Sequence, residues 1–206
     1  MTESFFTITR AVSCELREKR SLFIGQLLPV KSVAEAEAAL EDIRKTYHDA
    51  THNCFAYRID PDHYRFSDDG EPSGTAGRPI LAMLEKYRLL QVLLVVTRYF
   101  GGIKLGTGGL KRAYSACAEQ TILQAERVPF SRFQSFRLQY PYSLSRQVEQ
   151  VLRRHGAQLV SADYGEEITA LVQVPEEAAG RFVEALKQLP PAQMRFAYQD
   201  STWKSA

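Results

Sequence analysis

The feature that most constrains the fold is an apolar, β-branched run from Val92 to Tyr99. A run of this length and composition is typical of a strand that is buried on both faces. A turn with five glycines follows over 101–109, and a helix with apolar residues at helical spacing is expected over 110–126. The sequence therefore predicts a buried strand that leads through a glycine turn into a helix.

The residues before this strand predict an alternation of strands and helices. Ser32 and Glu35 form a capping box, in which each side chain can satisfy a backbone N–H at a helix start. Pro79 suits the first turn of a second helix, because its missing N–H costs nothing there. We predict strands over 5–12, 21–28, 53–59 and 64–67, and helices over 33–47 and from Pro79 to about Tyr87.

The pattern resets at Arg127-Val128-Pro129, which we take as the boundary between two domains, 1–128 and 129–206. Beyond it, periodicity predicts the order strand-helix-strand-strand-helix-strand, which is that of a ferredoxin-like module. The fold class is therefore α+β. The predicted elements are strands over 136–140, 158–164, 168–174 and 194–198, with helices over 144–155 and 176–189.

Composition excludes several classes of protein. Hydrophobic residues make up 45% of the chain, which is ordinary for a globular protein. Three cysteines, Cys14, Cys54 and Cys117, show no C-x-x-C spacing, so a disulfide framework or structural zinc site is not expected. No secretory signal opens the chain, and its apolar runs are too short to span a membrane. We therefore expect a cytoplasmic protein with no membrane partner.

A net charge of +2 hides a strongly basic segment around the glycine turn. Residues 98–112 contain four cations and no carboxylate. Glycines let backbone N–H groups approach a ligand, and a helix N-terminus adds partial positive charge, so this segment is a candidate phosphate cradle. Alternatively, the glycines only allow a tight connection between the strand and the helix. The candidate nucleic-acid- or anion-binding residues are Arg98, Tyr99, Gly101, Gly102, Lys104, Gly106, Thr107, Gly108, Gly109, Lys111 and Arg112.

The segment 60–71 is the acidic counterpart, with five carboxylates and one arginine. Hard oxygens of this kind can bind a divalent cation, but the spacing is not that of an EF-hand calcium loop. A turn and capping role is the alternative, and we predict neither a metal nor a cofactor. The loop residues expected to face the candidate site are Asp68, Asp69, Glu71, Ser73, Thr75 and Arg78.

The tripeptide His52-Asn53-Cys54 places an imidazole near a thiol, as a cysteine nucleophile requires. On a strand the two side chains share a face but diverge, and no third orienting group is evident. Because Cys54 is followed by the apolar Phe55, it is more often a small residue of the apolar core.

Two long motifs resemble a known family. Residues 66–80, FSDDGEPSGTAGRPI, and residues 98–110, RYFGGIKLGTGGL, are similar to the signature of the IMPACT N-terminal domain. Residues 19–24 and 52–54 also stand where that family has similar residues. The resemblance to the IMPACT/YigZ family covers about 1–125, and the second domain resembles the C-terminal domain of bacterial members in pattern only.

The resemblance implies a fold and a setting. It implies a first domain like the second domain of ribosomal protein S5 and a ferredoxin-like second domain. The pair looks like two domains of elongation factor G, which contact the ribosome. Eukaryotic relatives inhibit activation of an amino-acid-starvation kinase, a role that does not transfer directly to the bacterial form. The family supplies no established catalytic residues.

Three functional hypotheses remain at this stage. The first is a translation-associated regulator that binds RNA or the ribosome through the basic glycine turn, with no enzymatic activity. The second is a small-molecule kinase that holds a magnesium nucleotide between the glycine turn and the acidic loop. The third is an inhibitor that binds a basic protein partner through the acidic loop. The sequence does not give the oligomeric state.

Overall fold

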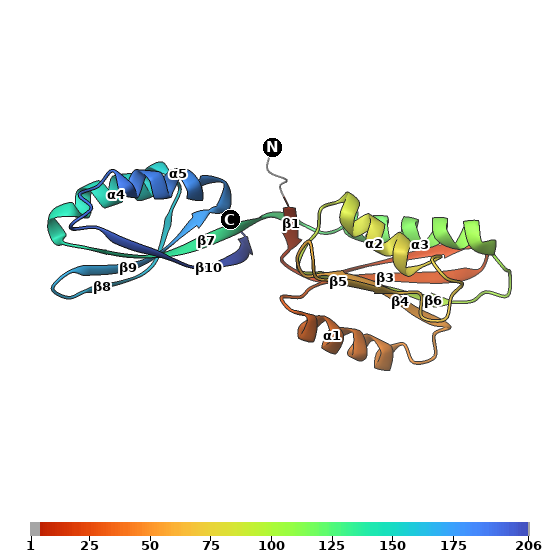
Figure 1. Cartoon of the computed structure of the whole chain (residues 1–206). Helices are drawn as coiled ribbons and strands as arrows, with labels where there is room; N and C mark the ends of the chain where they lie inside the picture. The colour runs from red at the N-terminus through yellow and green to blue at the C-terminus, as the bar shows by residue number, and fades with distance from the viewer. Residues whose placement is uncertain (1–4, 206) are drawn as a thin grey trace. The chain divides into compact units, whose positions relative to one another are not determined.

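The computed structural model describes residues 5–205, which form two compact units, residues 5–129 and 130–205 (Figure 1). Strand β7, Arg127–Tyr140, runs through the division, which falls after Pro129. The segment expected as a domain boundary, 127–129, is therefore the start of a strand that begins nine residues before the predicted Phe136.

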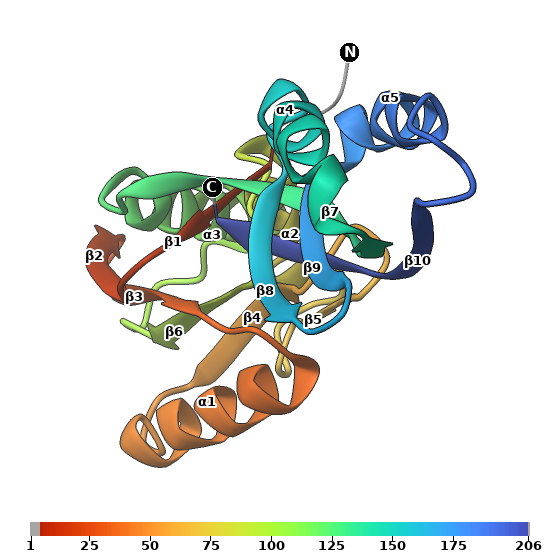
Figure 2. The same ribbon diagram turned by 90° about the vertical axis from the view of Figure 1, so that its left-hand side faces the viewer.

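The first unit is built on one antiparallel sheet of five strands. Its order is β2-β3-β6-β4-β5, with β2 Val12–Glu18, β3 Ser21–Pro29, β6 Val92–Tyr99, β4 His52–Arg58 and β5 Tyr64–Ser67. Helix α1, Val33–Thr46, covers one face, and helices α2, Gly77–Lys86, and α3, Gly106–Leu123, cover the other. Both views show this three-layer arrangement (Figures 1 and 2).

The central strand β6 explains why the apolar run was so informative. Its residues alternate between two cores, since successive side chains point to opposite faces of a sheet. Leu93 and Val95 pack in the cluster beneath α1, whereas Leu94 and Val96 pack in the cluster beneath α2 and α3. The prediction of a strand buried on both faces is confirmed.

Two boundaries in this unit differ from the prediction. The strand predicted over 5–12 is two strands, β1, Phe5–Ile8, and β2. Strand β1 binds the 88–90 segment, because the backbone of Phe6 exchanges two 2.9 Å hydrogen bonds with it. Helix α3 begins at Gly106, four residues before the predicted start, so the second half of the glycine turn is helical.

The second unit has the predicted order β-α-β-β-α-β. After β7 come α4, Ser145–Arg154, preceded by a short 3-10 turn over Tyr142–Leu144, then β8 Gln158–Tyr164, β9 Ile168–Pro175, α5 Glu176–Lys187 and β10 Arg195–Ser205. Strand β10 pairs with β7, β7 with β9 and β9 with β8, all antiparallel. Helices α4 and α5 lie side by side on one face of these strands (Figure 1).

The α+β fold class is confirmed. The S5-like label, which rests on the resemblance, and the ferredoxin-like label, which rests on the element order and the resemblance, stay predictions. Each unit has its own apolar core, as an independent domain requires. Within residues 5–205, no helix has the length and apolar character needed to cross a membrane.

Candidate nucleic-acid interface

The N-terminus of α3 is open to solvent. Leu105 occupies the N-cap position and provides no side-chain hydrogen bond to the helix. The first N–H groups of a helix have no intrahelical partner and carry partial positive charge. Here they belong to Gly106, Thr107 and Gly108, which are all exposed, and Gly106 has a φ of +71°. Unobstructed amide donors therefore face solvent at this helix end.

Cations surround this helix end from two separate parts of the chain. Lys104, Lys111 and Arg112 come from the turn and from α3 itself, and all three are exposed. The Arg112 guanidinium folds back along the helix, because its Nη1 lies 3.6 Å from where a Cβ on Gly108 would stand. The turn between β2 and β3 adds Lys19 and Arg20, which have φ values of 45° and 70°.

Close packing of the two turns brings cations from both of them to one cavity, Lys19 from one side and Arg112 from the other. A Cβ on Gly101 would lie only 2.0 Å from the backbone oxygen of Arg20, so the glycine lets the turns touch. Lys19 and Arg112 both line a cavity of about 300 Å3 beside Leu105 and Gly109, and Glu18 is the one carboxylate among its lining residues. Across the described chain, Lys19, Arg20, Lys104, Lys111 and Arg112 have no ion-pair partner.

We call this set the α3 basic surface: the side chains of Lys19, Arg20, Lys104, Lys111 and Arg112, with the backbone amides of residues 106–109. The sequence prediction missed Lys19 and Arg20, which entered only through the family resemblance. The signal was a pair of adjacent cations, but its link to the glycine turn depends on the unpredicted strand β2.

Arg98 does not belong to this surface, and the prediction that it meets phosphates is wrong. Only 5% of its surface is exposed. Its Nη1 donates to Glu71 Oε1 at 2.5 Å and its Nη2 to Ser21 Oγ at 3.3 Å. The guanidinium lies over the rings of Phe23 and Phe100, at 5.4 and 5.5 Å from their centroids. Its charge is therefore used inside the unit rather than offered to a ligand.

Tyr99 is also turned away. As the residue after Arg98 in β6 it points to the opposite face of the sheet, and its hydroxyl donates to Asp49 Oδ1 at 2.7 Å. The exposed apolar side chains of the glycine turn are instead Phe100, 45% exposed, and Ile103, 41% exposed. Gly101 and Gly102 shape this turn, the second with a φ of +84°.

The carboxylates of the acidic loop do not converge on one point. Asp68 accepts hydrogen bonds from the amides of Gly74, Ala76 and Gly77 at 2.7–2.9 Å, and so caps the start of α2. Asp69 accepts from the amide of Asn53 at 2.6 Å. Among residues 5–205, no cluster of histidine, cysteine, aspartate and glutamate is suited to hold a metal. The turn and capping interpretation fits this geometry.

The rest of the loop serves its own folding as well. Glu71 is buried and accepts from Tyr114 Oη of α3 at 2.8 Å in addition to Arg98. The Thr75 hydroxyl is buried and donates to Pro72 O at 2.6 Å, Arg78 lies 5.9 Å from the Phe66 ring centroid, and Ser73 is exposed. The three carboxylates that the kinase hypothesis requires, Asp68, Asp69 and Glu71, are thus engaged in internal bonds.

Cys54 is a core thiol in this structure. Its Sγ donates to Asp68 O at 3.0 Å and lies 3.3 Å from Tyr114 Oη, and burial raises its pKa. The His52 ring faces elsewhere: Nδ1 lies 2.7 Å from Asp69 O, and Nε2 lies 3.9 Å from Glu71 Oε1. Because the thiolate is the reactive form, this cysteine is not a poised nucleophile.

Alkylation of the native protein is therefore expected to modify one thiol. Burial raises the pKa of Cys117 to about 12 and that of Cys54 further, whereas Cys14 is only half-buried. Mass spectrometry after iodoacetamide treatment should show a single adduct, which a Cys14→Ser variant loses, and three adducts after denaturation. Rapid labelling of Cys54 in the native state would contradict the core assignment.

Comparison with known proteins places this geometry in a family. The sequence profile of the Impact N-terminal domain matches residues 19–122, and that of a domain of unknown function, DUF1949, matches residues 138–189. The chain is 38% identical to "IMPACT family member YvyE" of Bacillus subtilis, over 92% of this chain and 88% of that protein. It is 34% identical to "IMPACT family member YigZ" of Escherichia coli, over 80% and 82%.

A solved structure supports the same assignment. The crystal structure of a hypothetical protein, 30% identical to this chain, superimposes with a TM-score of 0.66 over 97% of this chain and 99% of that one. The chain is also 32% identical to human "Protein IMPACT", over 53% of this chain and 35% of that protein. Because both profiles match and the bacterial relatives align over most of their length, the chain belongs to the IMPACT family.

Proposed function

We propose that this protein binds RNA, free or within the ribosome, through the α3 basic surface, and acts as a regulator of translation rather than as an enzyme. The observation that carries the proposal is the uncapped start of α3, with five exposed cations on the two neighbouring turns and the first turns of the helix that have no ion-pair partner among residues 5–205. Backbone amides at a helix N-terminus bind phosphate oxygens without a side chain in the way. Cations that already have an internal partner, such as Arg98, add nothing to such a surface.

The arrangement favours phosphate contacts over base readout. Its donors are lysine, arginine and backbone amides, which fix position on a polynucleotide and carry no sequence information. Phe100 is the exposed ring nearest in sequence to the surface, and a ring of this kind can stack on an unpaired base. We therefore expect binding with little sequence preference and a strong dependence on salt.

The test is RNA and ribosome binding by a Lys19→Gln/Lys104→Gln/Arg112→Gln variant. Affinity for single-stranded RNA should fall about tenfold or more, and the slope of log affinity against log salt should fall by about 2, because each lost phosphate contact removes about 0.7. Filter binding at several salt concentrations measures both quantities, and co-sedimentation with ribosomal subunits extends them to the ribosome.

The matched control removes the same charge from other places on the first unit. An Arg10→Gln/Lys31→Gln/Lys45→Gln variant also loses one arginine and two lysines, and all three residues are exposed. This variant should keep the affinity and the salt slope of the wild type. If RNA affinity falls equally in both variants, the binding depends on net charge alone and not on this surface. If the first variant keeps the wild-type affinity, the α3 basic surface is not the binding site.

A further inference from the structure

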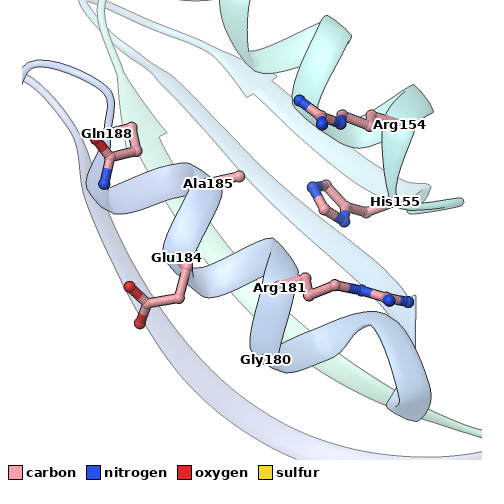
Figure 3. A pocket seen from close by; sticks show the side chains of 7 residues that line it. All are labelled: Arg154, His155, Gly180, Arg181, Glu184, Ala185 and Gln188. Atoms are coloured by element: carbon pink, nitrogen blue, oxygen red, sulfur yellow. The ribbon is translucent and has the colours of Figure 1, made fainter.

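A second basic site lies in the other unit, in the groove between α4 and α5. Its main cavity has a volume of about 410 Å3, and a neighbouring cavity of about 330 Å3 shares Arg154, His155 and Arg181 with it. Figure 3 shows His155 between the two arginines, with Arg154 and His155 at the end of α4 and Arg181 on α5. Three nitrogen-bearing side chains from two helices therefore border one hollow.

The hollow exists because α5 presents small residues to it. Gly180 lines the cavity, and a Cβ placed there would meet nothing within 4 Å. Ala185, one turn further along α5, also lines it and points into the groove in Figure 3. His155 is held in place by an edge contact with the buried ring of Phe182, with 6.0 Å between centroids. The floor is thus apolar and the rim is cationic.

The positive charge at this rim is not compensated. Arg154 and Arg181 are exposed and have no ion-pair partner among residues 5–205. Glu184 is the one carboxylate that lines the main cavity, and it pairs with Lys187 at 2.7 Å and points away from His155 (Figure 3). Burial lowers the pKa of His155, and the charges of Arg154 and Arg181 lower it further.

Helix dipoles do not account for this arrangement. A cation in the last turn of α4, such as Arg154, is favourable at the negative end of that helix. Arg181 stands in the middle of α5, where the dipole offers no such compensation. Its guanidinium lies on the side of α5 that faces His155, opposite to the side on which Glu184 points (Figure 3).

We propose that the α4–α5 groove binds a phosphate group between Arg154, His155 and Arg181. Guanidinium groups match the geometry of phosphate oxygens and form strong, charge-assisted hydrogen bonds with them. The imidazole adds an N–H donor, and it adds a positive charge as well when it is protonated. The phosphate can be carried by a small phosphorylated molecule or by RNA, and the apolar floor and the polar side chains of the groove would then contact the rest of the ligand.

The quantity to measure is the pKa of His155. NMR of the full chain gives this pKa at increasing concentrations of inorganic phosphate and constant ionic strength. A bound phosphate stabilises the protonated imidazole, so the pKa of His155 should rise, while chloride at the same ionic strength should leave it in place. The charged groups that line its cavities are Arg154, Arg181 and Glu184. The other three histidines, His48, His52 and His63, serve as internal references and report on the fold.

Two variants with equal charge make the test specific. In Arg154→Gln/Arg181→Gln, the pKa of His155 should be higher than in the wild type before phosphate is added, and phosphate affinity should fall about tenfold or more. In Arg146→Gln/Arg153→Gln, which removes two exposed arginines of α4 that line neither cavity, the response to phosphate should persist. An equal response in both variants, or none in the wild type, would overturn the proposal.

Two further ligands identify the source of the phosphate. A nucleoside 5′-monophosphate carries a terminal phosphate, whereas an RNA oligonucleotide without terminal phosphates carries only phosphodiesters. The ligand that shifts the His155 resonance at the lower concentration belongs to the class of molecule that the groove binds. The site is independent of the α3 basic surface, so the Lys19→Gln/Lys104→Gln/Arg112→Gln variant should titrate with phosphate at His155 as the wild type does.

Discussion

Replacement of Arg98 by methionine is expected to lower the free energy of unfolding by about 3–5 kcal/mol, the usual cost of removing one partner of a buried ion pair. Glu71 would then lose its ion-pair partner in a site where its side chain is only 3% exposed. The hydrogen bond from Tyr114 Oη would remain, and so would the His52 ring with its Nε2 3.9 Å from Glu71 Oε1, but the hydrogen bond from the guanidinium would be lost. Urea denaturation of the variant and the wild type measures the difference.

A double-mutant cycle separates the pair from its surroundings. Glu71→Gln alone leaves the Arg98 guanidinium without a carboxylate, so it should also be strongly destabilising. The Arg98→Met/Glu71→Gln variant should cost less than the sum of the two single variants, because no unpaired charge remains. A cost below about 1 kcal/mol for Arg98→Met would mean that the pair contributes as little as an exposed salt bridge.

Replacement of Gly101 by alanine is expected to destabilise the first unit by about 1–3 kcal/mol, the typical cost of forcing an extra methyl group into a packed site. The new Cβ would stand 2.0 Å from Arg20 O, and a backbone atom cannot rotate away as a side chain can. The β2–β3 turn must therefore move. Thermal or chemical unfolding measures the loss, and RNA affinity should fall with it because Lys19 and Arg20 would be displaced.

Gly180→Ala is the control for this experiment. Gly180 lies inside α5 with open space around it, so alanine there should stabilise the chain by about 0.5–1 kcal/mol through higher helix propensity. The two glycine replacements should thus have opposite signs. A neutral Gly101→Ala variant with unchanged RNA affinity would show that the contact between the two turns is dispensable.

Periodicity in the sequence was sufficient for most of the elements. The capping box at Ser32 and the apolar stripe behind it predicted α1 within one residue, and the Ser32 hydroxyl does accept from the amide of Glu35 at 3.2 Å. The limits of β6 were predicted correctly from its composition alone. These signals are local, since each depends on residues within one or two turns of the same element.

The start of α3 could not be predicted in the same way. Glycine has a low helix propensity, so a segment with Gly106, Gly108 and Gly109 was interpreted as a turn. Packing of the apolar face of α3 on the sheet overrides this weak preference. The strand β2 was missed for a related reason: its residues are mostly exposed, and its existence depends on pairing with β3.

The candidate site shows where local patterns stop being informative. A cation next to a glycine turn looks the same in sequence whether it is free or paired. Arg98 is paired because the fold brings Glu71, 27 residues away, against its guanidinium. Lys19 joins the surface because the β2–β3 turn packs against Gly101, some 80 residues further along the chain. Both outcomes depend on tertiary contacts between distant segments.

The trio of Glu71, Arg98 and Tyr114 has a consequence for how the family can diverge. Each of the three satisfies or neutralises another inside the first unit, so a lone substitution leaves a stranded donor or charge. Substitutions at these positions should therefore occur together in relatives. A relative with an uncharged residue in place of Arg98 should also have an uncharged residue in place of Glu71. Exchange of the whole trio between two relatives should be tolerated where exchange of any single member is not.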